Sequence, residues 1–221
     1  MGFTLKDYNT AVVHFKAHDP SIATLMLKVG YVAPPPKRNL FAILIGIIIG
    51  QKIRFNIARN QRSQLYTELG TDDFHLEHMM NKARQHLQVE DHVEVSNDNL
   101  IEKGLLFLEE IGITDSRLET IQRVVHHLHV NQIELLHPSQ LEEIKILKGI
   151  GPWTINATIL TWSLNEDNDQ FQDYLLTEDL IIRRGLLSLY GSLTTSELRD
   201  KVEAWSPWKG IVSFYLWKAF T

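Results

Sequence analysis

The residues with the most chemical information form a short Gly-Ile-Gly-Pro segment between two stretches of helical periodicity. Gly149 and Gly151 on either side of Ile150 predict a tight turn, because glycine lets backbone amides approach a phosphate oxygen closely. Pro152 suits the first position of the next helix, where its missing amide hydrogen costs nothing. The segment therefore predicts a helix-hairpin-helix that grips a nucleic-acid backbone. Glycines that merely cap helices are the alternative, because so short a motif is common.

A second group of interest is a carboxylate at the expected start of a later helix. Asp179 follows a polar, acidic segment at residues 165–173 and precedes an apolar run. A helix N-terminus presents free amides and the positive end of the helix dipole, so Asp179 should stay ionised at neutral pH. Glu178 is its nearest competitor, but successive helical side chains diverge by about 100°, so only one of the two can face a given site. Helix capping alone is the simpler role for Asp179.

The hairpin, the loop after it and Asp179 together resemble the helix-hairpin-helix-Gly/Pro-Asp superfamily of DNA glycosylases. The signature of that superfamily ends in one catalytic aspartate at a helix start, which implies that Asp179 is catalytic. Bifunctional members carry a lysine nucleophile two residues after the second hairpin glycine, where this chain has Trp153. The chain is therefore similar to the 3-methyladenine DNA glycosylase II branch, and no lyase activity is expected.

Three further segments resemble that branch and extend the similarity over nearly the whole chain. They are the Asp19-Pro20 helix start, the loop Gly50-Gln51-Lys52-Ile53, and Trp205-Ser206-Pro207-Trp208-Lys209 with the later Trp217. The chain also departs from the family. Leu180 and Ala157 stand where aromatic residues are frequent, Lys52 replaces a second glutamine, and Thr177 replaces a frequent proline. The pocket is thus expected to be less aromatic than in the best-known members.

The resemblance implies a reaction in base excision repair on damaged double-stranded DNA. The enzyme would flip out an alkylated purine, such as 3-methyladenine or 7-methylguanine, and hydrolyse its N-glycosidic bond to leave an abasic site. A carboxylate would stabilise the positive charge that develops on the sugar and position or deprotonate the attacking water. A non-catalytic helix-hairpin-helix DNA-binding module is the alternative.

The resemblance also implies a substrate pocket. Trp153 and Trp217 are its expected walls, because an aromatic face attracts a positively charged base by roughly 0.5 to 2 kcal/mol. Core packing is the other role for each tryptophan, and it is the favoured one for Trp205 and Trp208. Leu180 and Ala157 complete the expected substrate-binding residues.

The expected DNA contacts come from two segments. Gln51 would hydrogen-bond to the orphaned base, and Ile53 would enter between base pairs. The full set of expected DNA-binding residues is Gln51, Lys52, Ile53, Lys148, Gly149, Ile150, Gly151 and Thr154. A sodium or potassium ion would bridge hairpin and phosphate through three backbone carbonyls, those of Lys145, Leu147 and Ile150.

No cofactor is expected for catalysis. The chain has no cysteine, which excludes disulfides and thiolate metal sites, including an iron–sulfur cluster. The pairs His75 with His78 and His126 with His129 lie one helical turn apart. They lack a third ligand, so ordinary surface histidines are expected.

Composition limits the other possibilities. The 221 residues, 44% of them hydrophobic, are enough to bury a core. A net charge of −5 requires that any DNA affinity be local. The basic residues near the motifs are Lys52, Arg54, Arg59, Arg62, Lys145, Lys148, Arg183, Arg184, Lys209 and Lys218.

The apolar stretch Leu40–Ile49 is about half a membrane span, so no membrane partner is expected. We expect a monomer that is intracellular and located with the DNA, in a prokaryotic nucleoid or a nucleus.

Helical periodicity dominates, and no alternating run is long enough to predict a sheet. The fold class is all-α, a two-lobed helical DNA glycosylase fold with the active cleft between the lobes. The expected helices are Leu5 to Ala17, Ser21 to Gly30, Asn39 to Gly50, Ile53 to Gly70, Phe74 to Gln88, Asn97 to Ile111, Thr114 to His129, Pro138 to Leu147, Pro152 to Ser163, Asp179 to Tyr190, Thr195 to Ala204 and Pro207 to Phe220. Residues 1–221 form a single glycosylase unit with a central lobe at about 40–145. The second lobe, about 1–36 plus 146–221, contains the hairpin and the catalytic aspartate.

Overall fold

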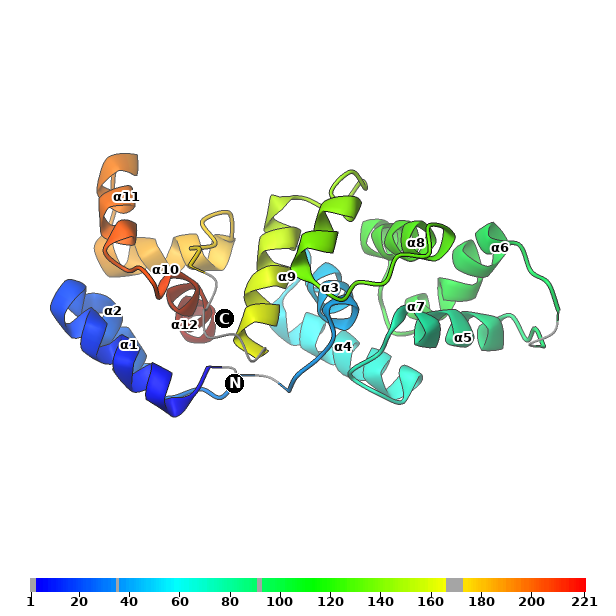
Figure 1. Ribbon diagram of the computed structural model, residues 1–221, viewed down its shortest axis with the longest axis horizontal. Coiled ribbons are helices and arrows are strands. Elements are labelled where there is room, and N and C mark those ends of the chain that lie inside the picture. The colour runs from blue at the N-terminus through cyan, green and yellow to red at the C-terminus, as the bar shows by residue number, and fades with distance from the viewer. Residues whose placement is uncertain (1–2, 35, 91–92, 166–172) are drawn as a thin grey trace. The chain divides into compact units, whose positions relative to one another are not determined.

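The computed structural model describes residues 3–34, 36–90, 93–165 and 173–221 of the chain. Within these ranges the chain forms twelve α-helices and two short 3-10 helices, with no strand (Figure 1). The all-helical fold class predicted from periodicity is therefore confirmed. No helix of the described residues is long and apolar enough to cross a membrane.

Contacts between backbone positions divide the chain into two compact units. The terminal unit combines Met1–Lys37 with Ile159–Thr221, and the central unit is Arg38–Thr158. The sequence placed the hairpin with the terminal helices, whereas this division places it with the central ones. The reason is local, because hairpin carbonyls accept hydrogen bonds from Gln51 and Arg123, both of which lie in the central unit.

Five helices belong wholly to the terminal unit. They are α1 (Leu5–His18), α2 (Pro20–Val29), α10 (Leu180–Tyr190), α11 (Thr195–Glu203) and α12 (Lys209–Phe220). Helices α1 and α2 pack against each other, and α2 and α10 both pack on α12. Gly185 permits the close contact between α10 and α12, because a Cβ there would lie 2.8 Å from Leu216 Cδ2. Helix α10 is thereby held close against α12.

Side-chain caps fix where these helices begin. Four residues accept hydrogen bonds from amides of the first helical turn: Thr4, Asp19, Asp179 and Thr194. Such caps satisfy amides that the helix itself leaves without partners. With Thr194 as its cap, α11 begins at Thr195, where the sequence predicts its start.

A buried carboxylate links several segments of the terminal unit. Asp19 is 3% exposed, and its Oδ2 accepts hydrogen bonds from Tyr190 Oη at 2.9 Å, Trp205 Nε1 at 2.9 Å and Lys201 Nζ at 3.3 Å. Its Oδ1 accepts from the amides of the first turn of α2. Trp205 is fully buried here, which confirms its predicted packing role.

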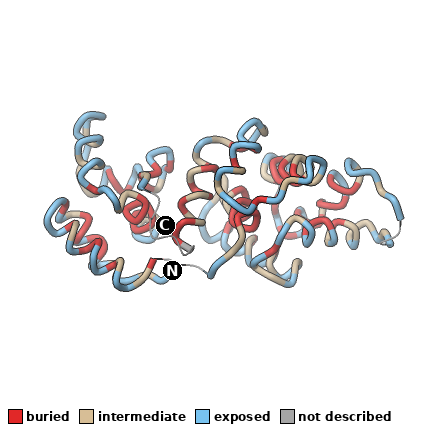
Figure 2. The backbone as a smooth tube through the Cα atoms, viewed as in Figure 1, coloured by how far each residue is buried: buried red, intermediate tan, exposed pale blue. Residues whose placement is uncertain are grey.

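The central unit contains the remaining elements. They are α3 (Leu40–Ile49), α4 (Phe55–Leu69), α5 (Leu76–His86), α6 (Asn97–Glu102), the 3-10 helix Gly104–Leu106, α7 (Phe107–Glu110), α8 (Asp115–Val130) and the 3-10 helix Pro138–Ile144. Helix α9 (Pro152–Asn165) begins in this unit and continues into the other. All residues of α3 except Ile47 are buried, as the red tube in Figure 2 shows. The most apolar stretch of the chain is therefore part of the core.

Two expected helices differ from the structure. The stretch Asn97 to Ile111 was predicted as one helix and is divided into three pieces. A Cβ at Gly104 would lie 2.8 Å from Ala83 Cβ, so close packing on α5 is present where the helix is interrupted. The stretch Pro138 to Leu147 is a 3-10 helix that ends at Ile144. Its amides bond to carbonyls three residues back, for example Lys145 to Glu142.

Candidate functional site

The predicted hairpin forms a turn between the 3-10 helix Pro138–Ile144 and α9. The amide of Ile150 closes it with a 3.0 Å hydrogen bond to the carbonyl of Leu147, and the Ile150 side chain is 6% exposed. Gly149 has a φ of +100°, and a Cβ there would lie 2.1 Å from Thr120 Oγ1 of α8. Only glycine fits this position, because the backbone is left-handed and the turn lies directly on α8.

The two hairpin glycines present amides at the start of α9. Within the described residues, neither the Gly149 nor the Gly151 amide donates a hydrogen bond to another group of the chain. A Cβ at Gly151 would meet nothing within 4 Å, so the space beside it is open. Free amides at the N-terminus of a helix form a favourable site for an anionic oxygen. The hairpin therefore presents two amide donors at this helix start, with open space beside Gly151.

Arg123 orients one of these amides. Its Nη1 donates a 3.0 Å hydrogen bond to the carbonyl of Lys148, and its Nη2 is paired with Glu119 on the same helix. A trans peptide places the carbonyl oxygen and the next amide hydrogen on opposite sides. Holding the Lys148 oxygen toward α8 thus directs the Gly149 amide away from α8. This role of Arg123 was not predicted, because nothing in the local sequence pairs it with the hairpin.

The Gln51-Lys52-Ile53 loop lies against the same hairpin. Gln51 Nε2 donates to the carbonyl of Gly149 at 3.1 Å and to Thr154 Oγ1 at 2.9 Å. Thr154 is 2% exposed, so its hydroxyl is an internal contact in this structure. Lys52 is exposed with a φ of +57°, and Ile53 is half-buried. The two segments expected to contact DNA are thus joined by one side chain.

Two arginines support the base of this loop. Arg62 Nη1 donates to the carbonyl of Gly46, and Arg117 Nη1 donates to that of Ile49, each at 3.0 Å. Both carbonyls lie near the C-terminus of α3, where a cation offsets the negative end of the helix dipole. Burial lowers the pKa of the Arg62 guanidinium. The sequence placed Arg62 among the basic residues near the motifs, whereas in the structure its guanidinium bonds to the backbone of α3.

The three carbonyls expected to hold a monovalent cation differ in their hydrogen bonds. Leu147 O accepts the hydrogen bond from the Ile150 amide. Within the described residues, the carbonyls of Lys145 and Ile150 accept none, so their oxygens are available as ligands. The ammonium of Lys145 is paired with Glu142, and Lys148 is exposed.

In the terminal unit, Asp179 is the N-cap of α10. Its Oδ1 accepts hydrogen bonds from the amides of Ile181 at 2.7 Å and Ile182 at 3.1 Å. The residue is 8% exposed. The exposed competitor Glu178 accepts a hydrogen bond on Oε1 from the Tyr174 hydroxyl. The two neighbouring carboxylates are therefore held by different partners.

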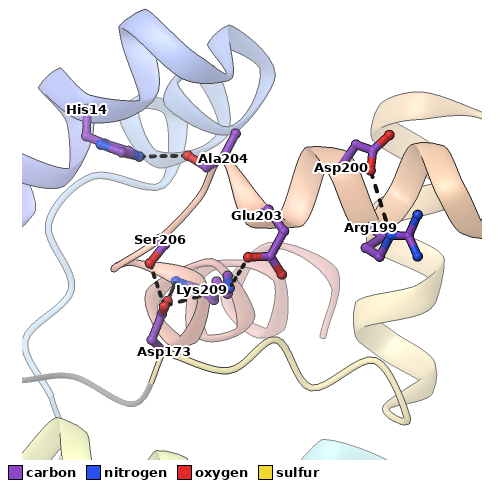
Figure 3. A network of polar contacts seen from close by, with 8 residues as sticks. All are labelled: His14, Asp173, Arg199, Asp200, Glu203, Ala204, Ser206 and Lys209. Carbon is purple, nitrogen blue, oxygen red and sulfur yellow. Dashed lines mark hydrogen bonds and ion pairs between the residues drawn. The ribbon is translucent and has the colours of Figure 1, made fainter.

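The segment before Asp179 is anchored on the C-terminal helix and the turn before it. Asp173 accepts hydrogen bonds from the Ser206 hydroxyl at 2.6 Å and the Lys209 amide at 3.3 Å (Figure 3). The amide of Leu176 donates to Ser213 Oγ at 3.0 Å, and Ser213 is fully buried. These contacts fix the segment at Asp173 and at Leu176. The sequence singled out neither Asp173 nor Ser213.

Lys209 does not extend the basic surface that the sequence suggested. Its ammonium lies 3.2 Å from Glu203 Oε2 and 3.7 Å from Asp173 Oδ2, and its side chain is 13% exposed (Figure 3). Two carboxylates thus neutralise it. The motif Trp205-Ser206-Pro207-Trp208-Lys209 has a structural role in this arrangement.

The expected pocket residues fall in both units. Trp153 is half-buried at the second position of α9, and Ala157, one turn later, is fully buried. Both belong to the central unit. Trp217 on α12 is half-buried, and Leu180, the first residue of α10, is 65% exposed. These two belong to the terminal unit.

The histidine pairs carry ordinary contacts. His126 Nε2 lies 3.2 Å from Asp98 Oδ1, and His78 Nδ1 accepts from the His75 amide. Across the part of the chain that the structure describes, no group of three or more His, Cys, Asp or Glu residues is placed to hold a metal ion.

Comparison with known proteins shows the fold. No family model matches the sequence, and none of the curated proteins compared matches it. The chain superposes on a DNA-3-methyladenine glycosidase from Bacillus halodurans with a TM-score of 0.58 and 22% identity, over 99% of this chain and 91% of that one. It also matches an 8-oxoguanine glycosylase/lyase from Clostridium acetobutylicum with a TM-score of 0.57 and 17% identity, over 96% of this chain and 69% of that one. The latter was solved in complex with double-stranded DNA that contains cytosine opposite 8-oxoguanine. This chain therefore has the helical fold of these DNA glycosylases.

Proposed function

We propose that this protein is a monofunctional DNA glycosylase of the helix-hairpin-helix-Gly/Pro-Asp superfamily, acting on alkylated purines in double-stranded DNA. The observation that supports it best is the hairpin, whose two glycine amides donate no hydrogen bond among the described residues, in a chain with a DNA glycosylase fold. The proposal assigns the DNA grip to the central unit and the catalytic carboxylate to the terminal unit. Each assignment has its own structural support.

Asp179 is proposed as the catalytic carboxylate. Its Oδ1 is fixed by two amides of α10, so the carboxylate needs little reorganisation when charge develops nearby. When the N-glycosidic bond breaks, the electron pair leaves with the base and positive charge develops on the deoxyribose. The carboxylate stabilises this charge and orients or deprotonates the water that adds to the sugar, which leaves an abasic site.

The substrate class is inferred from the tryptophans and the leaving group. Trp153 and Trp217 are both half-buried, so neither residue is wholly enclosed in the core. A purine alkylated on a ring nitrogen carries positive charge, which an aromatic face attracts. The same charge makes the base a good leaving group, so one carboxylate is enough. Leu180 and Ala157 stand where aromatic residues are frequent in the superfamily, and each replacement affects which lesions are accepted.

Hydrolysis without lyase chemistry follows from the residue at position 153. A glycosylase-lyase needs an amine that attacks the sugar and forms a Schiff base, and Trp153 stands where relatives carry that lysine. Lys148 is the amine nearest to the hairpin in sequence, and we propose that it contacts phosphate. Borohydride would trap a covalent adduct with DNA if a lysine attacked the sugar, and we expect none.

A sodium or potassium ion is proposed at the hairpin. The carbonyls of Lys145, Leu147 and Ile150 would hold it, and the ion would supply positive charge to a DNA phosphate. The protein groups that grip the same phosphate are the Gly149 and Gly151 amides. Phosphate contacts set position on DNA and carry no sequence information.

The test is release of free bases from methylated duplex DNA, resolved by chromatography, by the wild-type protein and by Asp179→Asn. We expect 3-methyladenine or 7-methylguanine from wild type alone. The variant should still bind damaged DNA, because the neutral isostere keeps the shape of the site and cannot stabilise the cation. DNA binding without base release by wild type would instead identify a non-catalytic binding module or a different lesion.

A further inference from the structure

Gln51 makes contacts that differ from its expected role of reading an orphaned base. Its side-chain Nε2 lies 3.1 Å from the Gly149 carbonyl and 2.9 Å from Thr154 Oγ1, so both amide hydrogens are committed to the hairpin. We infer that Gln51 is a positioning residue, which fixes the loop Gly50–Arg54 to the hairpin before DNA binds. The inference rests on the proposed function, because it treats both segments as one DNA-gripping surface.

The loop has few other fixed points. The amides of Gly50 and Gln51 bond back to the last turn of α3. Within the described residues, the amides of Lys52 and Ile53 donate no hydrogen bond, and Lys52 has a left-handed backbone. The Gln51 carboxamide therefore supplies the side-chain hydrogen bonds that this loop makes to the hairpin.

On the hairpin, Gln51 holds the peptide group between Gly149 and Ile150. The Gly149 carbonyl points to Gln51, and the amide of the same peptide, that of Ile150, points the opposite way to the Leu147 carbonyl. Holding one side of a planar peptide thus stabilises the hydrogen bond on its other side. Arg123 holds the preceding peptide in the same way through the Lys148 carbonyl. Arg123 thereby aims the Gly149 amide, and Gln51 holds the peptide that precedes the one carrying the Gly151 amide.

The contact also changes what Gln51 can offer to DNA. With both Nε2 hydrogens used, its carboxamide presents only the Oε1 acceptor to an incoming base. A base-reading role would need the hairpin contact to break first. The positioning role needs no rearrangement, and it predicts that removing the carboxamide disturbs the hairpin in the absence of DNA.

The experiment compares Gln51→Met, which keeps the side-chain length and removes both donors, with Gln64→Met as control. Gln64 is exposed on α4, and it is not one of the described residues whose side chains bond to the hairpin carbonyls, namely Gln51 and Arg123. Hydrogen exchange of the free proteins is followed at the Ile150 amide. Loss of two neutral hydrogen bonds should speed exchange about tenfold in Gln51→Met, and Gln64→Met should match wild type. Unchanged exchange in Gln51→Met overturns the inference.

A second variant reaches the same contact from the other side. Thr154→Val keeps the buried shape and removes the hydroxyl acceptor, so it should speed the same exchange. Combined with Gln51→Met it should add little, because both changes remove one shared contact. Full additivity of the two effects contradicts the contact and overturns the inference even if either single variant is less stable.

DNA binding separates the positioning role from a base contact. Affinity is measured for duplexes that carry an abasic-site analogue opposite each of the four bases. We expect Gln51→Met to weaken binding about tenfold for all four. A loss confined to one opposing base, with unchanged hairpin exchange, assigns Gln51 to base reading and overturns the inference. If wild type binds no DNA, the proposed function fails, and the exchange measurement still decides the role of Gln51.

Discussion

The hydroxyl of Tyr174 donates a 2.6 Å hydrogen bond to Oε1 of Glu178, the residue next to Asp179 in the chain. Glu178 is exposed, whereas Asp179 is 8% exposed and bonded to two helix amides. Two adjacent carboxylates thus have different environments. An exposed carboxylate bound to a phenol stays well solvated, so its electrostatic effect on a reacting sugar is screened.

The first prediction uses this contrast. Asp179→Asn should lower the single-turnover rate at least about 100-fold, which is the usual scale for removing a transition-state charge stabiliser. Glu178→Gln should keep the rate within about threefold, since its side chain has another partner. Both rates are measured with the same methylated duplex at saturating protein. A large loss in Glu178→Gln with activity kept in Asp179→Asn would move the catalytic role to Glu178.

The second prediction concerns the anchor of the segment before Asp179. Ser213→Ala removes the acceptor of the Leu176 amide in a fully buried position. A buried amide without a partner costs about 1 to 3 kcal/mol, so the free energy of unfolding should fall by that amount. Urea denaturation measures it. Ser188→Ala, an exposed position on α10, is the matched control and should change little.

The third prediction separates the two hairpin glycines. Gly149→Ala should destabilise the protein by about 3 kcal/mol, because its Cβ would overlap Thr120 Oγ1 and its φ is +100°. Gly151→Ala should fold with nearly wild-type stability, since a Cβ there meets nothing within 4 Å. We expect Gly151→Ala to lose DNA affinity about tenfold instead, because the methyl group occupies the approach of a phosphate. Wild-type affinity in Gly151→Ala would argue against the phosphate grip.

The fourth prediction is a dependence of stability on alkaline pH. Burial raises the pKa of Tyr190 above its ordinary 10.0, and the charge of Asp19 and the hydrogen bond to it raise the pKa further. Folding therefore favours the protonated phenol. This contribution is complete below pH 10 and is lost as the pH rises through the folded-state pKa.

Tyr190→Phe removes that contribution together with one donor to Asp19. At pH 8 the variant should be less stable than wild type by about 1 kcal/mol, the typical value of one hydrogen bond. The difference in free energy of unfolding between the two proteins should narrow between pH 10 and 11.5, because only the wild type loses the contribution of the Tyr190 phenol. Burial also raises the pKa of Tyr215, so both proteins still lose some stability at alkaline pH. A stability difference that widens as the pH rises would contradict the role assigned to Tyr190.

The sequence predicts most of this fold because its helices are defined locally. Caps at Asp19 and Asp179 and the apolar run of α3 act over a few residues. The division of Asn97 to Ile111 could not be predicted, because it accompanies close packing of Gly104 on Ala83, which is distant in the sequence. Long-range packing of this kind leaves no local pattern.

For the candidate site, the motif residues were predictable from the sequence, and the contacts that hold them were not. The hairpin and Asp179 stand in short motifs, and the structure gives each a matching local geometry. The contacts that hold them come from other helices, namely Thr120 and Arg123 of α8 and Ser213 of α12. Gln51 was identified from its motif, but its partners lie about one hundred residues away in the chain. Motifs thus identified the groups, and the structure supplied what orients them.

The division of the chain at Thr158 has an optical consequence. Of the five tryptophans, only Trp153 lies in the central unit, and Trp162, Trp205, Trp208 and Trp217 lie in the terminal unit. The tryptophan fluorescence of Trp153→Phe therefore comes from the terminal unit alone. Its difference from the wild-type spectrum is the emission of one indole beside the hairpin. The two signals allow the melting of each unit, and quenching by DNA at the hairpin, to be followed with no added dye.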